Sequence, residues 1–154
     1  MSRPTWDDVW MSVAKDIAQR SLCTRSQVGC VIVTRQNAVV SVGYNGPPAG
    51  MRVEGPCSGW CPRVKTGGAP ASYDDCYSSH AEMNALVRGA RADFEGGVMY
   101  VTRMPCYTCA KVIANSGLAW VVVHPSLDDQ DREPERSELV MRKSGLLVRT
   151  YHVD

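Results

Sequence analysis

The second half of the chain alternates short β-branched runs with segments of helical character, and this alternation constrains the fold most. The expected order is strand, helix, strand, helix, strand, over Val98 to Thr102, Cys106 to Ser116, Ala119 to Val123, Pro134 to Gly145 and Leu146 to His152. A helical crossover between two neighbouring strands of one sheet makes those strands parallel. The sequence therefore predicts an α/β fold whose last two strands are parallel.

The first half of the chain predicts two helices, a strand hairpin and a long loop. Thr5 and Asp8 have the spacing of a capping box, and apolar residues follow at helical intervals. The expected elements are a helix over 5–22, antiparallel strands over 28–33 and 38–44, and a helix over 80–90. Residues 45–78 are rich in glycine, proline and cysteine, which predicts a loop. The complete pattern predicts a five-stranded mixed sheet covered by helices.

Length and composition limit the classes of protein that the chain can belong to. The 154 residues, of which 44% are hydrophobic, predict one compact domain over 1–154. A formal net charge of +1 makes a nucleic-acid partner unexpected. No apolar stretch reaches membrane-spanning length, and the N-terminus lacks the apolar core of a signal peptide. Seven cysteines without an export signal indicate a reducing compartment, so a cytoplasmic location is expected.

Two short motifs, each at the start of an expected helix, predict a zinc site. They are His80-Ala81-Glu82 and Pro105-Cys106-Tyr107-Thr108-Cys109, and together they match the pattern of the zinc deaminases. Cys106 and Cys109 lie three residues apart on one helix face, where the helix dipole favours thiolates. With His80 they provide three zinc ligands and leave a fourth position for water, whose pKa falls to about 7 on zinc.

Glu82 is predicted to be the catalytic proton shuttle of this site. It follows the histidine by two residues, so it is placed to reach the zinc-bound water and a substrate ring rather than the metal itself. Either motif alone has a simpler explanation. His-x-Glu pairs are common on solvated helices, and Cys-x-x-Cys also occurs in redox sites and structural zinc sites. The two motifs together favour the deaminase.

Several stretches around these motifs resemble the deoxycytidylate deaminase family, within the cytidine deaminase superfamily. They are Ser21 to Gly29, Gly43-Tyr44-Asn45-Gly46, His80 to Leu86, and Met99 to Thr102 continuing through Pro105 to Lys111. The resemblance implies a three-layer α-β-α sandwich. It also implies the zinc-dependent hydrolysis of deoxycytidylate (dCMP) to deoxyuridylate (dUMP) and ammonia, which would supply dUMP for thymidylate synthesis.

The resemblance further assigns substrate contacts, partners and effectors. Asn45 is expected to bind the sugar hydroxyl, Arg25 the phosphate, and Ala81 to contact the substrate. The flanking glycines Gly43 and Gly46 allow the backbone to approach closely at Asn45, although an Asn-Gly turn is the simpler local explanation. An exposed loop arginine is the simpler explanation of Arg25. Members of the family are commonly hexamers and are often regulated by dCTP and dTTP.

The remaining cysteines suggest a second, structural zinc. Many family members carry one between the end of the first helix and the long loop, and the matching residues are Cys23, Cys57, Cys61 and Cys76. Four thiolates would close a tetrahedral site and tether the loop. The alternative is that these cysteines are simply reduced. Cys30 stands apart and is expected to be a small hydrophobic residue buried in a strand.

One departure from the family pattern keeps other substrates open. Many relatives have a substrate-contacting tyrosine after the fourth strand, whereas this chain has no aromatic residue from His124 to Asp129. His124 is expected to be a surface residue at a strand end. The alternatives are a deaminase of another or modified cytosine nucleotide, of a nucleoside or of a base in tRNA, and a non-catalytic zinc module. Glu82 argues against the last, since a structural zinc needs no proton shuttle.

Overall fold

The computed structural model describes residues 2–65, 75–126 and 133–152, and its centre is one five-stranded sheet. The strands lie in the order β2-β1-β3-β4-β5. Their bounds are β1 (Gly29–Val33), β2 (Val39–Tyr44), β3 (Val98–Val101), β4 (Trp120–Val123) and β5 (Leu147–Thr150). β1 pairs antiparallel with β2 and β3, whereas β3, β4 and β5 are parallel. The predicted mixed sheet with parallel last strands is confirmed.

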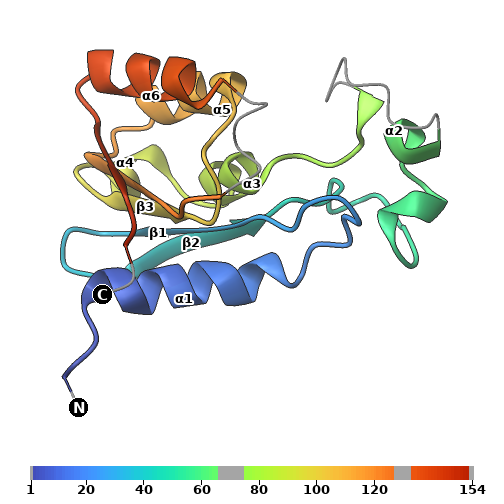
Figure 1. The fold of residues 1–154 in the computed structure, drawn as a ribbon, viewed down its shortest axis with the longest axis horizontal. Coiled ribbons are helices and arrows are strands. Elements are labelled where there is room, and N and C mark those ends of the chain that lie inside the picture. Colours follow the sequence, from blue (N-terminus) through green and yellow to red (C-terminus); the bar gives the residue numbers. More distant parts are fainter. Residues whose placement is uncertain (1, 66–74, 127–132, 153–154) are drawn as a thin grey trace.

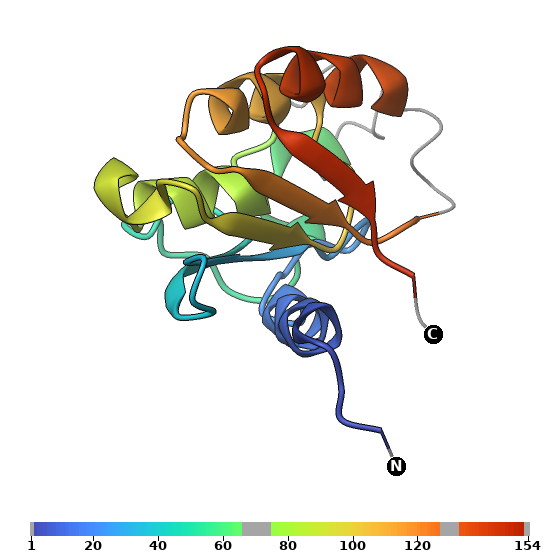
Figure 2. The same ribbon diagram turned by 90° about the vertical axis from the view of Figure 1, so that its left-hand side faces the viewer.

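Helices cover both faces of the sheet, which gives the expected three layers (Figure 1). α1 (Trp6–Ala18) lies alone on one face. The opposite face carries α3 (Ala81–Val87), α4 (Arg91–Phe94), α5 (Tyr107–Ala114) and α6 (Pro134–Lys143), as Figure 2 shows. Successive strand residues point to opposite faces, so Val31 and Val122 join the core under α1, whereas Ile32 and Val121 join the core under the other helices.

The capping box predicted for α1 is present. The Thr5 hydroxyl accepts a hydrogen bond from the Asp8 N–H at 3.2 Å, and the Asp8 carboxylate accepts one from the Thr5 N–H at 2.8 Å. The helix ends at Ala18 and is shorter than the predicted range of 5–22. Ser21, within that range, instead donates its hydroxyl to the carbonyl of Asn45 at 2.8 Å. This tertiary hydrogen bond accompanies the turn of the chain out of the helix and towards the sheet.

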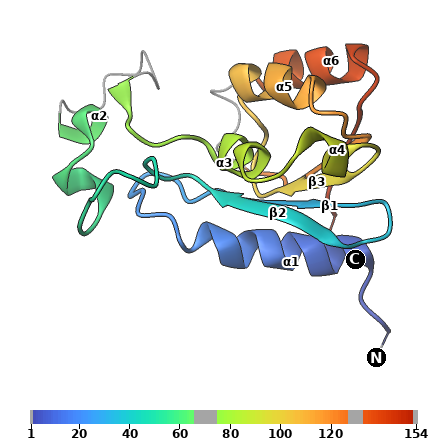
Figure 3. The same cartoon turned by 180° about the vertical axis from the view of Figure 1, so that it is seen from behind.

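The other predicted elements are present with small shifts at their ends, and three short helices are new. These are α4, the 3-10 helix η1 (Cys57–Gly59) and α2 (Pro62–Lys65). The last two lie in the predicted loop 45–78, of which residues 66–74 are outside the described part. Figure 3 shows that η1 and α2 project from one side of the sheet. None of the helices in the described ranges has the length and apolar character needed to span a bilayer.

Glycines allow two helices to pack directly on the strand backbone. A Cβ atom on Gly29 of β1 would overlap the carbonyl oxygen of Ala14 in α1. A Cβ atom on Gly43 of β2 would overlap the carbonyl oxygen of Ala81 in α3. Both overlaps are with backbone atoms, which cannot rotate away as a side chain can. The distance between each helix and the sheet therefore depends on having no side chain at these two positions.

We expect Gly29→Ala to destabilise the protein by about 2 kcal/mol, because the added methyl group must push α1 away from β1. The melting temperature should fall by about 4–8 °C, measured by circular dichroism. Gly50→Ala is the matched control, since a Cβ atom there meets nothing within 4 Å. Equal melting temperatures for the two variants would contradict this account of the α1–β1 contact.

Candidate active site

The predicted zinc motifs meet at the edge of the sheet where β3 ends and α5 begins. His80 is the N-cap residue of α3, and Cys106 is the N-cap residue of α5. Both residues have extended backbone conformations, which turn the chain sharply into each helix. Cys109 lies one turn into α5 and is 2% exposed. The N-termini of two helices therefore converge on one point, where the helix dipoles favour negative charge.

The three candidate ligand atoms have separations that suit zinc. The Nδ1 atom of His80 lies 3.4 Å from the sulfur of Cys106 and 3.4 Å from the sulfur of Cys109. Nitrogen and sulfur ligands held tetrahedrally at zinc bond lengths are about 3.6 Å apart. Within the described ranges, this is the only group of three such residues whose ligand atoms all lie within 4.8 Å of one another. The donor set therefore fits a zinc ion without rearrangement.

The pKa values of the two cysteine thiols are shifted in opposite directions. A hydrogen bond from the Cys109 thiol, followed by one from His80, lowers the pKa of Cys106 well below its usual range. The same hydrogen bond to Cys106, followed by burial and the charge of Glu82, raises the pKa of Cys109. The metal-free pair thus holds a thiolate at Cys106 and a thiol at Cys109. Binding of zinc would displace the remaining proton.

Glu82 lies in the first turn of α3 and is 4% exposed. Its charge contributes to the raised pKa of Cys109 and also, after burial, to that of Cys30. Glu82 therefore interacts electrostatically with one zinc ligand, Cys109, and with one thiol buried in the sheet. Cys30 is fully buried in β1, as predicted, but its electrostatic interaction with Glu82 was not predicted, because only the tertiary fold brings β1 and α3 together.

Besides the packing of α3 on Gly43, three hydrogen bonds fix the start of α3. The Asn84 amide donates to the Tyr44 carbonyl at 2.8 Å. The segment before His80 pairs with the end of the hairpin, since Ser79 and Gly46 exchange two backbone hydrogen bonds of 2.9 and 3.1 Å. His80 and Glu82 are therefore held by β2 and the residues after it, whereas the cysteines are held by β3 and α5.

Comparison with known proteins agrees with this geometry. Residues 4–125 match the family model for the cytidine and deoxycytidylate deaminase zinc-binding region. The chain belongs to this family. It is 45% identical over 128 residues to a deoxycytidylate deaminase of Mycobacterium phage D29, covering 79% of this chain and 96% of the phage protein. It is 35% identical over 152 residues to a deoxycytidylate deaminase of Saccharomyces cerevisiae, covering 98% of this chain but only 46% of the yeast protein.

A solved structure from the family has the same fold. The crystal structure of a dCMP deaminase from cyanophage S-TIM5, in its apo form, superposes with a TM-score of 0.68 at 26% sequence identity. The match covers 97% of this chain and 100% of the phage chain. The cytidine deaminase fold that the resemblance implied is thereby confirmed, as is the family.

The residues predicted to contact the substrate differ in their surroundings. Asn45 joins two segments: its Oδ1 accepts from the Val28 N–H at 2.8 Å, and its Nδ2 donates to the Ser26 carbonyl at 2.9 Å. Arg25 is exposed on the connection between α1 and β1. Ala81 is fully buried at the first position of α3, so only its main chain could contact a ligand. Asn45 therefore has a structural function whatever else it binds.

Contacts beside the site involve residues that the sequence did not single out. Arg103, on the connection from β3 to α5, donates its Nη1 to the Ser26 hydroxyl at 2.7 Å. Arg136 of α6 stacks 3.9 Å above the ring of Tyr107, the residue after Cys106. Arg103 and Tyr107 lie close to Cys106 in the sequence, and this closeness could have indicated that they lie beside the site. Their partners could not be found from the sequence, because they come from distant segments.

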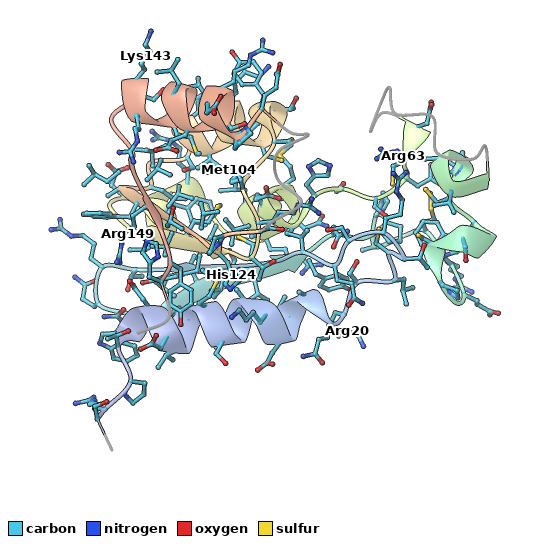
Figure 4. All side chains as sticks on the ribbon, in the orientation of Figure 1. Arg20, Arg63, Met104, His124, Lys143 and Arg149 are labelled. Atoms are coloured by element: carbon cyan, nitrogen blue, oxygen red, sulfur yellow. The ribbon has the colours of Figure 1, made fainter. Side chains whose placement is uncertain are left out.

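The segment without the expected tyrosine is only partly described. Leu127, Asp128 and Asp129 lie outside the described residues, so this departure from the family pattern stays a prediction from the sequence. His124 is half-buried at the end of β4, with its ring 5.9 Å from that of Tyr151. It was expected to be a surface residue. Figure 4 shows its side chain between β4 and α1.

Of the four cysteines predicted to hold a second zinc, two contact each other and a third contacts the segment beside the fourth. The sulfur atoms of Cys61 and Cys76 are 3.5 Å apart. The sulfur of Cys57 accepts from the Thr24 N–H at 3.2 Å, and this places it beside the segment that carries Cys23. The four sulfurs do not form a group as compact as the one at His80. Cys57 belongs to η1 and Cys61 directly precedes α2, the helix on which Figure 4 labels Arg63.

We expect Cys109→Ser to weaken zinc binding at the His80 site by roughly 100-fold or more, since even changes outside the ligand set cost 10- to 100-fold. Competition with a chromophoric chelator at neutral pH measures this affinity. Cys30→Ala is the control, because Cys30 is equally buried but its sulfur is not among the grouped ligand atoms. Unchanged zinc affinity in Cys109→Ser would argue against this ligand set.

Proposed function

We propose that the protein hydrolyses dCMP to dUMP and ammonia. The observation that carries this proposal is the buried carboxylate of Glu82, in the first turn of the helix that His80 caps, beside a complete zinc ligand set. A structural zinc site has no use for a buried acid beside it. The substrate class is supported by the phage and yeast relatives, which are deoxycytidylate deaminases and share 45% and 35% of the aligned residues.

The chain supplies the proton transfers of this reaction. Zinc, when bound by His80, Cys106 and Cys109, lowers the pKa of a coordinated water so that it becomes a nucleophile near neutral pH. Glu82 would accept one proton of this water and deliver it to ring atom N3 as the water oxygen bonds to C4 of cytosine. Glu82 would then take the remaining proton of that oxygen and pass it to the exocyclic amine, so that the C4–N bond breaks, the C4 carbonyl forms and ammonia leaves. One water is consumed for each dUMP formed.

The expected substrate contacts are compatible with the contacts inside the protein. Asn45 uses one hydrogen of its Nδ2 and one lone pair of its Oδ1 within the chain, and each atom has a second site. These second sites suit a sugar hydroxyl. Arg25 offers a guanidinium fork for the phosphate. The N–H of Ala81 belongs to the first turn of α3, whose N–H groups have no acceptor within the helix, so it is suited to the substrate base.

The decisive assay offers equal amounts of dCMP, CMP, deoxycytidine and cytidine to the zinc-loaded protein. We expect preferred conversion of dCMP. Glu82→Gln should lower kcat by at least about 100-fold, since it removes the general acid and base. Glu135→Gln, an exposed glutamate of α6, is the control and should keep full activity.

Other outcomes of this assay would redirect the proposal. Preferred turnover of CMP or a nucleoside would leave the chemistry intact and change the substrate. Full activity of Glu82→Gln would contradict the proton-transfer function. If zinc is bound but all four compounds stay intact, deamination of these free nucleotides is wrong.

We further infer that Cys23, Cys57, Cys61 and Cys76 hold a second zinc with a structural function. The short distance between the sulfurs of Cys61 and Cys76, and the attachment of Cys57 to the segment beside Cys23, support this inference. Four thiolates close the coordination sphere of zinc. The ion would tie the projecting η1 and α2 region to the end of α1.

For this second ion we expect two zinc equivalents in the wild-type protein and one in Cys61→Ser. The remaining ion should support dCMP turnover, because Cys61 is outside the candidate active site. The variant should also melt at a lower temperature, since metal binding energy contributes to folding. Elemental analysis gives the stoichiometry. A single equivalent in the wild-type protein would show that these cysteines are simply reduced.

Length and composition support one domain over residues 1–154, and the cysteine content supports a cytoplasmic location. The family resemblance supports assembly into a homo-oligomer, by resemblance a hexamer, and regulation by dCTP and dTTP.

A further inference from the structure

Ser26 lies between two side chains of the candidate site. Its carbonyl accepts from the Asn45 amide at 2.9 Å, and its hydroxyl accepts from Arg103 Nη1 at 2.7 Å. Asn45 follows β2, Ser26 precedes β1, and Arg103 follows β3. Three connections at one edge of the sheet thus meet at Ser26. Arg103 is also three residues before Cys106, which places it on the loop that leads to the zinc ligands.

Hydrogen bonds link Asn45 to Ser26 and Ser26 to Arg103, so these three residues form one connected group. If the cytosine base faces the zinc ligands and the sugar hydroxyl binds Asn45, the next part of the nucleotide is the 5′-phosphate. The polar side-chain groups connected to Asn45 through Ser26 are the Ser26 hydroxyl and the Arg103 guanidinium, which are already joined to each other. This step rests on the function proposed above.

The chemistry of this pair suits a phosphate dianion. A guanidinium carries five N–H donors in a planar fork, which matches two phosphate oxygens. A serine hydroxyl that accepts a hydrogen bond from arginine can donate its own proton to a phosphate oxygen. Ser26 and Arg103 are both half-buried, so their attraction for an anion is screened less than that of an exposed arginine. The contact with Ser26 also orders Arg103 beforehand, which reduces the entropy lost on binding.

We propose that Arg103, held by Ser26, binds the 5′-phosphate and thereby makes the enzyme prefer a nucleoside monophosphate to the nucleoside. Arg25, exposed and adjacent to Ser26, adds positive charge at the same place. The competing explanation is that Arg103 only fastens the β3–α5 connection to the α1–β1 connection.

The test compares dCMP with deoxycytidine in the zinc-loaded protein. We expect Arg103→Gln to lower kcat/KM for dCMP by about 100-fold, mainly through KM, and to change the value for deoxycytidine less than twofold. Arg103→Lys keeps the charge but loses the fork and should recover part of the loss. Arg35→Gln, in the exposed connection between β1 and β2, is the control and should leave both values unchanged. Calorimetric binding of dUMP and deoxyuridine repeats the comparison without turnover.

The possible results separate this inference from the proposed function. Equal losses for both substrates, or equal losses in the binding of dUMP and deoxyuridine, would mean that Arg103 is only structural and would overturn the inference. An undiminished preference for dCMP in Arg103→Gln would also overturn it. If the wild-type protein already treats dCMP and deoxycytidine alike, the monophosphate preference in the proposed function is wrong, and a phosphate site at Arg103 is wrong with it.

Discussion

The candidate site depends on the contact between α3 and the backbone of β2 at Gly43. Because no side chain separates them, α3 lies as close to the sheet as a helix can, and His80 and Glu82 are carried with it. The cysteines arrive by another path, from β3 into α5. Ligand atoms from these two paths come within 3.4 Å of each other. The ligand atoms can come this close only if α3 lies at the right distance from the sheet. Gly43, which is far in the sequence from any ligand, allows that distance.

The electrostatics of the site follow from this convergence. Two cysteines, one histidine and one glutamate gather in a small, mostly buried volume beside two helix N-termini. Without metal, the hydrogen bond to Cys106, burial and the charge of Glu82 together raise the pKa of Cys109, so that its thiol keeps the proton. A divalent cation reverses this balance, because it stabilises both thiolates at once. The arrangement of these side chains thus favours the binding of a divalent cation.

The parts of this arrangement that depend on local sequence could be predicted. Spacing and residue type predict the starts of the helices near Thr5 and Cys106 and the parallel last strands. They also predict the grouping of His80, Cys106 and Cys109. The parts that depend on distant segments could not be predicted. Examples are the Ser26–Arg103 contact, the electrostatic interaction of Cys30 with Glu82 and the early end of α1, which all arise where distant segments of the chain meet. The helices η1 and α2 were missed because their short sequences, Cys57–Gly59 and Pro62–Lys65, lack any apolar period.

The first turn of α1 holds the last strand of the sheet. Asp7 accepts hydrogen bonds from Tyr100 at 2.7 Å and Arg149 at 2.8 Å, and Asp8 accepts one from Tyr151 at 2.8 Å. The contact with Tyr151 joins residues 143 positions apart. A ribosome therefore makes α1 long before the residues that it holds at β5. The hydrogen bonds to Arg149 and Tyr151 can form only after the chain has been made and released from the ribosomal tunnel as far as Tyr151.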